Sequence, residues 1–344
     1  MPQNPLTTAA QNDSTGLKWI WDFGFLRPQE LGTLLWPDAK HASKAGERIA
    51  RKWLKNGLIL RRELPNHSGS VLVLSKAGAE YLSHAQGIDA RSGKDIGSMT
   101  AGDWSPPATW RHDLLASGLL ALLRRDGYTI MPEQLLRREN PNKLVPDGIA
   151  IKDGKAIWIE VESARKTGSH MDKMCRSLIA AARGAGVTVL SGITCTQAAV
   201  AYDPAQTDER GHALGHHQRV CAGLKRYTPT DIALQFIQLK KTGAGVSGYE
   251  IALGLIEADA ITRAMAKMTW SERMGDGGEQ EHYTQAIPGL FEIAYARKDD
   301  AWMARLILDE DCYDPTTKSL RFNTLKDLKR YAAKMSLGMI KVTR

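Results

Sequence analysis

The clearest alternation of apolar and polar positions occupies two adjacent stretches, 145–151 and 155–162. Between them lies Asp153-Gly154, and an Asp-Gly pair flanked by apolar runs is the strongest short-range signal for a β-hairpin. A two-residue turn fixes the pairing of the two strands, because the residues on either side of it must face each other. The pattern therefore predicts two antiparallel strands with a defined register.

Counting back from this turn brings three carboxylates together. Asp147 lies opposite Glu160, and Glu162 shares a strand face with Glu160 because side chains alternate along a strand. Residues directly opposite each other lie about 5 Å apart. Two unit charges about 4 Å apart repel by roughly 4 kcal/mol at an effective dielectric near 20. We therefore expect a proton, a basic side chain or a hard cation such as Mg²⁺ or Mn²⁺ at these three acids.

A second interpretation of the hairpin involves no metal. In it, the strands are exposed and their acids pair with Arg165, Lys166 or Lys173, which follow the second strand. Motif matches of this length have a real false-positive rate, so both interpretations stay open at this point.

Nearer the N-terminus, the spacing of apolar residues predicts two helices, and a second pair of strands follows them. Pro28 suits the first turn of a short helix, and a longer helix runs from about Ser43 to Asn56-Gly57. Two strands and a short closing helix are predicted next, at 58–63, 71–74 and 75–82. This order of elements is typical of a winged helix-turn-helix.

Basic residues form one stripe on the longer helix, at i, i+3, i+4 and i+7, whereas Ala45, Ile49 and Trp53 form an inward stripe. A basic helix of this kind can enter a DNA groove, and the hairpin can reach the neighbouring backbone. A net charge of +8 favours a polyanionic partner. A protein-binding role for this segment is the alternative. The expected DNA-binding residues are Arg48, Arg51, Lys52, Lys55, Arg61 and Arg62.

Pro146-Asp147 with Glu160-x-Glu162 resembles the core of the PD-(D/E)xK restriction-endonuclease-like superfamily. The resemblance implies that Asp147 and Glu160 hold a divalent metal, Mg²⁺ or Mn²⁺, in a catalytic site. Glu162 stands where most members carry lysine, so its implied role is to bind metal or orient water. The apolar helix that opens at Trp110 resembles the leading helix of that fold, with His112 as a catalytic residue near a phosphate.

The order of these parts narrows the resemblance to the replication-relaxation proteins of plasmids and to the MOB-C class of conjugative relaxases. It implies a cytoplasmic nickase that recognises double-stranded DNA at a transfer or replication origin of a mobile element. Single-stranded DNA and other relaxosome or conjugation proteins would be further partners. The alternatives are a non-catalytic winged-helix regulator or relaxosome accessory protein on an inactive nuclease fold, and a defence nuclease that cuts both strands.

The chain is therefore predicted to be an α/β protein, α+β overall. We expect a winged helix-turn-helix at 15–84, a polar linker at 85–108, a restriction-endonuclease-like mixed-sheet domain at 109–250 and a C-terminal extension at 251–344. In the extension, strands are predicted at 303–308 and 319–322 and a helix at 325–339.

Other features change this picture little. No apolar run is long enough to cross a bilayer and no secretory signal is evident, so we expect no membrane insertion. The four cysteines form no Cys-x-x-Cys pair and are expected to be reduced.

A helix carrying His212, His216, His217 and Cys221 offers a weaker metal hypothesis; solvated or DNA-facing histidines are the favoured interpretation. Tyr128, Tyr202 and Tyr227 lie in no motif, so water is the expected nucleophile.

Overall fold

The chain divides into two compact units, Met1–Ala252 and Leu253–Arg344, and each is described by itself. The computed structural model describes residues 5–100, 103–141, 143–164, 166, 168–184, 188–189, 193–207, 211–212, 214–225, 234–243, 245–252, 271–274, 281–287, 290–298, 301–307, 320–322, 327 and 330–331.

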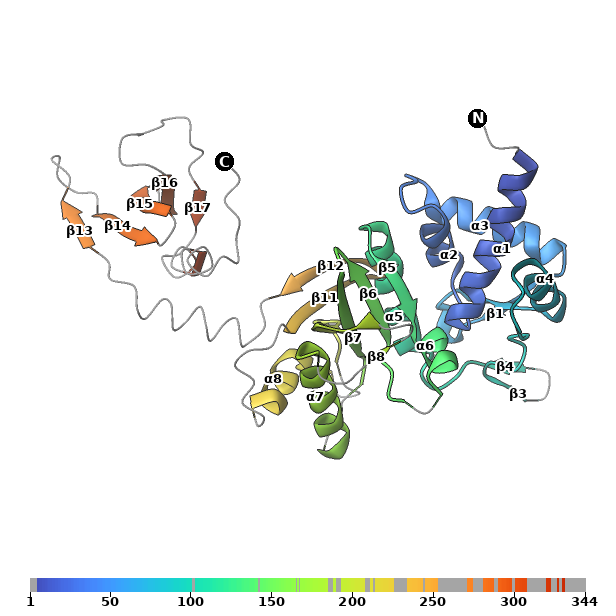
Figure 1. The fold of residues 1–344 in the computed structure, drawn as a ribbon. Coiled ribbons are helices and arrows are strands. Elements are labelled where there is room, and N and C mark those ends of the chain that lie inside the picture. The colour runs from blue at the N-terminus through green and yellow to red at the C-terminus, as the bar shows by residue number, and fades with distance from the viewer. Residues whose placement is uncertain are drawn as a thin grey trace. The chain divides into compact units, whose positions relative to one another are not determined.

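The first unit begins with helices that precede and follow a short hairpin (Figure 1). The predicted helices, strand pair and closing helix are all present, and one long helix, α1, precedes them. The bounds are α1 Pro5–Phe23, α2 Pro28–Leu35, α3 Ala42–Lys55, β1 Ile59–Glu63, a 3₁₀ turn Pro65–His67, β2 Ser70–Leu74 and α4 Lys76–Gln86.

Helices α2 and α3 approach each other closely because glycines stand at their contact. A Cβ on Gly46 would lie 2.0 Å from the Pro28 carbonyl oxygen, and one on Gly32 would lie 2.1 Å from that of Ala42. Trp53, the inward residue predicted on α3, is fully buried. Contact between α2 and α3 therefore depends on the missing side chains at Gly32 and Gly46.

The polar segment predicted as a linker contains a small hairpin, β3 (Ser98–Thr100) and β4 (Asp103–Ser105). The backbone N–H of Gly93 donates to the Leu74 carbonyl at 2.9 Å, and the Trp104 indole donates to the Ile96 carbonyl at 2.8 Å. The first bond holds the segment against β2, and the second is made within the segment.

A six-stranded mixed sheet forms the other half of the unit, in the order β12-β11-β10-β7-β6-β5. Strand β10 runs parallel to both of its neighbours, β7 and β11, and the other pairings are antiparallel. This confirms the mixed α/β class. The bounds are β5 Thr129–Pro132, β6 Gly148–Lys152, β7 Lys155–Glu162, β10 Gln197–Tyr202, β11 Leu234–Thr242 and β12 Gly245–Ala252.

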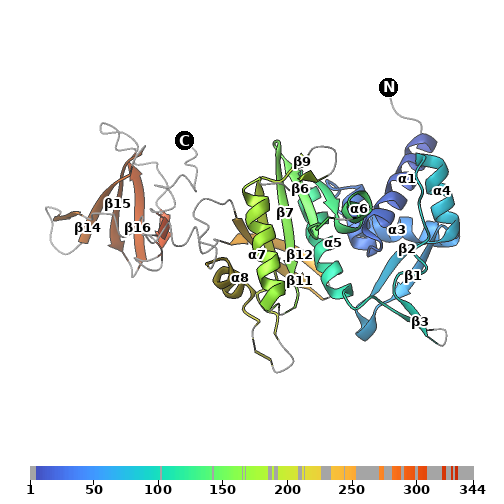
Figure 2. The same ribbon diagram turned by 60° about the horizontal axis from the view of Figure 1, so that its bottom comes forward.

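Helices cover both faces of this sheet (Figure 2). Helix α5 (Trp110–Arg125) packs on one face, where Leu119 joins Ile159 and Ala201 in the main hydrophobic core. Helix α7 (Gly168–Ala182) packs on β7 and β10 from the other side and contacts α8 (His216–Lys225). The remaining elements are α6 (Glu133–Glu139) and the short pair β8 (Thr188–Val189) and β9 (Ile193–Thr194).

In the second unit, the described residues form five antiparallel strands in sequential order. The strands predicted at 303–308 and 319–322 correspond to β16 and β17, which pair with each other. Only residues 327, 330 and 331 of the predicted terminal helix are described, and they are helical; the rest lies outside the described residues. The bounds are β13 Ser271–Met274, β14 Glu281–Ile287, β15 Leu290–Lys298, β16 Ala301–Ile307 and β17 Leu320–Phe322. Across the described ranges, no helix is both long and apolar enough to cross a membrane.

Candidate functional site

The β6–β7 hairpin has the register that the sequence predicted. Asp153 and Gly154 both have positive φ, 51° and 72°, as a type I′ turn requires. The ladder then pairs Lys152 with Lys155 and ends at Gly148 and Ile159. Asp147 therefore stands beside Glu160, directly beyond the last pair.

Asp147 is held by donors from two elements. Its Oδ2 accepts the backbone N–H of Val161 at 2.6 Å, which ties the residue to the facing strand. The same oxygen lies 3.1 Å from Nε2 of His112, in the first turn of α5. The structure thus brings His112 and Asp147, two of the predicted site residues, into contact.

Glu160 and Glu162 share the face of β7 that carries Trp158, whereas Ile159 and Val161 are buried on the α5 side. The Trp158 indole donates to Oε1 of Glu160 at 2.8 Å. Glu162 is almost completely buried, and Lys166 donates to its Oε1 at 2.5 Å. The alternation of side chains thus places both glutamates at the end of β7 that lies next to Asp147.

The site holds more acid than base. Burial raises the pKa of Asp147 to about 7, and burial together with the nearby charge of Asp147 raises the pKa of Glu160 to about 8. Burial also raises the pKa of Glu162 against the opposing effect of Lys166. Burial alone would lower the pKa of Lys166, but Glu162, Glu160 and Asp147 outweigh it and raise that pKa. The Lys166 ammonium group therefore acts on all three carboxylates, and His112 and Arg219 also act on Glu162.

Within the described part of the chain, no three His, Cys, Asp or Glu side chains are arranged as a metal-binding group. Mg²⁺, however, is often held by one or two carboxylates, with water and substrate phosphate completing its shell. Asp147 and Glu160 fit that smaller requirement, because both supply carboxylate oxygens and stand beside each other at the end of the hairpin ladder. Glu162 is already paired with Lys166.

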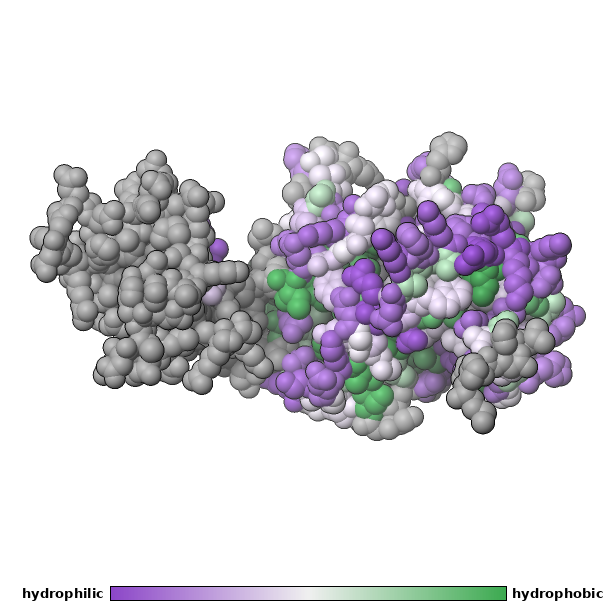
Figure 3. Space-filling view, turned by 90° about the horizontal axis from the view of Figure 1, so that it is seen from above, coloured by the Kyte–Doolittle hydropathy of each residue, from purple (hydrophilic) through white to green (hydrophobic). Residues whose placement is uncertain are grey.

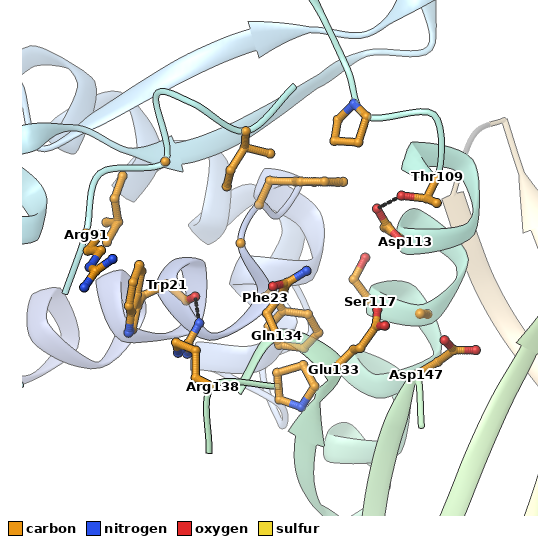
Figure 4. Close-up of a pocket in the computed structure, with 18 of the residues that line it drawn as sticks. Trp21, Phe23, Arg91, Thr109, Asp113, Ser117, Glu133, Gln134, Arg138 and Asp147 are labelled. Carbon is orange, nitrogen blue, oxygen red and sulfur yellow. Dashed lines mark hydrogen bonds between the residues drawn. The ribbon is translucent and has the colours of Figure 1, made fainter. Parts of the chain in front are cut away.

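Two hollows adjoin these residues. A cavity of about 600 Å³ extends from Asp147 between α5, α6 and the end of α1 (Figure 4). A second hollow of about 460 Å³ is lined by the 3₁₀ turn of the β1–β2 hairpin and by the chain just after Glu162. Its polar lining residues include Asn66, Ser68, Arg111, Ser163 and Lys241. The hairpin tip therefore borders the same hollow as Ser163, the residue that follows Glu162.

The predicted basic residues of α3 are all exposed, and Figure 3 shows hydrophilic side chains over much of the face of the first unit that it displays. Lys52 pairs with Asp13 at 2.7 Å, and Arg61 of β1 pairs with Glu47 at 3.2 Å. Arg62 is only half-exposed, and its Nε is buried without a hydrogen-bond partner. The exposed stripe consists of Arg48, Arg51, Lys52 and Lys55.

The predicted histidine helix differs from the structure. Helix α8 begins at His216, so His212 precedes it and shares no helical face with it. His216 is buried, its Nε2 lies 3.3 Å from the Gln206 side-chain oxygen, and burial lowers its pKa. The expectation of a solvated or DNA-facing histidine is therefore wrong for His216. Cys221 is also buried, and the side chain of His217 lies outside the described residues.

Sequence reasoning did not assign Lys166 to the site. It named this residue only as one of three basic side chains able to neutralise an exposed hairpin. The available signal was the position of Lys166 four residues after Glu162 and just before α7. No spacing rule, however, shows that the side chain of a loop residue contacts the preceding strand. Trp158 was overlooked as well, although it lies on the same strand face as Glu160.

Comparisons of the chain with models of known protein families, with curated proteins and with solved structures found no match.

Proposed function

We propose that this protein is a DNA-binding, metal-dependent endonuclease or nickase. The observation that carries the proposal is the group formed by Asp147, Glu160, Glu162 and Lys166 at the end of β7, with His112 beside it. Burying three carboxylates beside one ammonium group costs folding free energy. Proteins most often bear such a cost at a functional site. Such clusters of shifted pKa values are typical of catalytic sites.

In the proposed mechanism, Asp147 and Glu160 would hold Mg²⁺ or Mn²⁺. Such an ion would supply a Lewis acid for a phosphoryl oxygen and for an attacking water. Glu162 keeps Lys166 at the site, and the Lys166 ammonium group stabilises charge that develops on the phosphate. His112 Nε2 lies against Asp147, so its other ring nitrogen, Nδ1, is the proposed donor to a phosphate oxygen when it carries a proton. The Asp147–Val161 hydrogen bond keeps the first carboxylate fixed in place.

Water is the proposed nucleophile. The Tyr202 side chain is buried and accepts a hydrogen bond from Gln238 at 3.1 Å, and the Tyr128 ring lies 5.0 Å from the Lys152 ammonium group. Neither tyrosine lines the two hollows beside the acids. Tyr227 lies outside the described residues.

The N-terminal helices and hairpin are the proposed DNA-docking part, acting as a winged helix. The support is an exposed basic stripe on α3 and a hairpin tip that borders the same hollow as Ser163, next to Glu162. Lysine and arginine contacts to phosphates would give salt-dependent affinity without sequence preference. By the resemblance in the order of its parts, we further propose a transfer or replication origin of a mobile element as the target, and relaxosome proteins as partners.

One observation favours a second candidate function. Glu162 is already neutralised by Lys166, and the described residues include no three-ligand metal group. A non-catalytic DNA-binding regulator or relaxosome accessory protein on an inactive nuclease fold would also have this arrangement.

A nicking assay separates the two candidates. Supercoiled plasmid carrying the candidate origin is incubated with protein and Mg²⁺ or Mn²⁺, and relaxed product is measured on gels. Glu160→Gln should reduce nicking by at least about a hundredfold, since it removes one of two proposed metal ligands. The matched control is Glu80→Gln, at an exposed position on α4, which should keep wild-type activity. DNA binding with no nicking by the wild-type protein would support the regulator.

A further inference from the structure

The cavity beside Asp147 has two chemically different ends (Figure 4). At one end lie the carboxylates of Asp113, Glu133 and Asp147. At the other end, the guanidinium of Arg138 lies 4.3 Å from the centre of the Trp21 ring. The volume, about 600 Å³, falls within the range of pockets that hold small organic ligands. A ligand of matching chemistry would have hydrogen-bond donors at the acidic end.

The walls between these ends are largely apolar and aromatic. Phe23, Phe25, Ile96 and Leu120 contribute to them, as does Pro132. Flat rings bind favourably against such side chains. A nucleobase is a flat ring system with polar edges, and its sugar is attached to phosphate. The cavity therefore suits the flat base of a nucleotide. Arg138 is paired with Asp22 at 2.8 Å and Arg91 with Asp89 at 3.3 Å, so an organic cation is the competing ligand that the test must include.

The acidic end favours one base over the others. Asp113 has its Oδ2 engaged by the Thr109 hydroxyl at 3.0 Å, and Glu133 is bound by Arg137 through Oε1. Ionised carboxylates only accept hydrogen bonds. Guanine presents two adjacent donors, its ring N1–H and its exocyclic amine. Adenine, cytosine and thymine each place an acceptor next to their donor on that edge, where a carboxylate would meet it.

We propose that this cavity binds an unstacked guanine base, with Asp113 as the principal acceptor of its N–H groups. The inference deepens the proposed function, since Asp147 belongs to both the cavity and the proposed catalytic site. Enzymes that do chemistry on a base turn it out of the stack and contact its Watson–Crick edge in a pocket, and a nuclease that selects its site by one base could use the same geometry. A guanine next to the scissile phosphate would then fix which bond is cut. A free guanine nucleotide has the same recognition chemistry.

Binding can be measured without cleavage. The full-length protein in EDTA is titrated calorimetrically with 2′-deoxyguanosine, 2′-deoxyinosine, thymidine and spermidine. Deoxyinosine lacks only the exocyclic amine, so it should bind about tenfold more weakly than deoxyguanosine. Thymidine should bind more weakly still. In parallel, the anisotropy of a labelled thymidine oligonucleotide is compared with that of one carrying a single central guanine. Tighter binding of the second identifies a base in DNA, whereas a preference confined to the nucleosides identifies a free nucleotide.

Asp113→Asn replaces one acceptor by a donor and should abolish the preference for deoxyguanosine over deoxyinosine. Asp38→Asn, at an exposed turn between α2 and α3, is the matched control and should retain it. Equal binding of deoxyguanosine and thymidine, binding of spermidine alone, or an unchanged preference in Asp113→Asn would overturn the proposal. If Asp113→Asn does not fold, the wild-type comparison of deoxyguanosine with deoxyinosine still decides. Since no metal is present, failure here would leave the nicking result of Glu160→Gln unaffected.

Discussion

At the scale of single residues, two contributions of Lys166 can be separated: its effect on fold stability through Glu162 and its effect on DNA cleavage. Glu162 has a side-chain exposure of 1%, whereas Lys166 is about one-third exposed at 33%. Lys166→Ala leaves a buried carboxylate without its cation and should destabilise the fold by about 2 kcal/mol, less than for a fully buried pair. Thermal unfolding measures this loss.

The double variant Lys166→Ala/Glu162→Gln tests what Lys166 does beyond stabilising the fold. It removes the uncompensated charge and should recover most of the lost stability. Nicking should remain lost if Lys166 acts on the phosphate. Recovery of both stability and nicking would show that Lys166 has only a structural role.

The two shifted acids make a second prediction, about pH. The pKa values of Asp147 and Glu160 are about 7 and about 8 in the folded protein, against 3.8 and 4.5 for the free side chains. The folded state therefore binds more protons than the unfolded state over roughly pH 4 to 8, and stability must fall as pH rises through that window.

In EDTA, the melting temperature should drop by several degrees between pH 6 and pH 8, because the two shifts together correspond to roughly 3 kcal/mol. Asp147→Asn/Glu160→Gln should remove most of this drop. Added Mg²⁺ should stabilise the wild-type protein more at pH 8 than at pH 6, because a cation favours the ionised acids. A pH dependence that is the same in the double variant would contradict the shifted pKa values.

At the scale of elements, the contact of α2 with α3 depends on glycine. A Cβ at residue 46 would lie 2.0 Å from the Pro28 carbonyl oxygen, and backbone there can move only if the helices separate. Gly46→Ala should therefore cost about 2 kcal/mol or more in unfolding free energy, measured by chemical denaturation. Gly248→Ala is the matched control, since a Cβ there would lie 3.7 Å from its nearest neighbour, Cδ of Lys240. Equal losses of unfolding free energy in the two variants would show that α2 and α3 can move apart without a large cost.

The basic stripe on α3 is tested as one element. Arg48, Arg51 and Lys55 are replaced together by alanine, which leaves the Lys52–Asp13 pair intact. If these side chains contact phosphates, DNA affinity should fall, and the slope of log K against log salt should shrink by up to about three. Filter binding at several salt concentrations measures both. Lys76→Ala, at a highly exposed position on α4, should leave the slope unchanged.

Local signals in the sequence predicted several elements and part of the site. The Asp153-Gly154 turn determined the hairpin register, and register alone was enough to bring Asp147 to Glu160. Helix α1 was not predicted, because polar residues dominate its first half and its buried Leu17 and Ile20 come late. Pairings such as that of β7 with β10 were also missing, since strands far apart in sequence carry no signal of which neighbour they choose.

At the scale of the whole molecule, the helices and the sheet of the first unit share one hydrophobic core. Leu17 of α1 and Trp53 of α3 belong to the same cluster as Leu119 of α5 and Ala201 of β10. The predicted boundary between a DNA-binding domain and a nuclease domain falls inside this unit. Cutting the chain at residue 108 would therefore expose apolar surface on both products.

This shared core leads to a prediction about fragments. Residues 1–252 should fold by themselves with one cooperative thermal transition, whereas residues 109–252 should be poorly folded because the apolar surface of α5 that contacts α2 is uncovered. Circular dichroism and scanning calorimetry of the two purified fragments measure this. Fragment 1–252 contains every residue of the proposed catalytic site, so it should also nick plasmid DNA like the full chain. A stable, cooperative 109–252 fragment would mean that the contact between the helices and the sheet contributes little to stability.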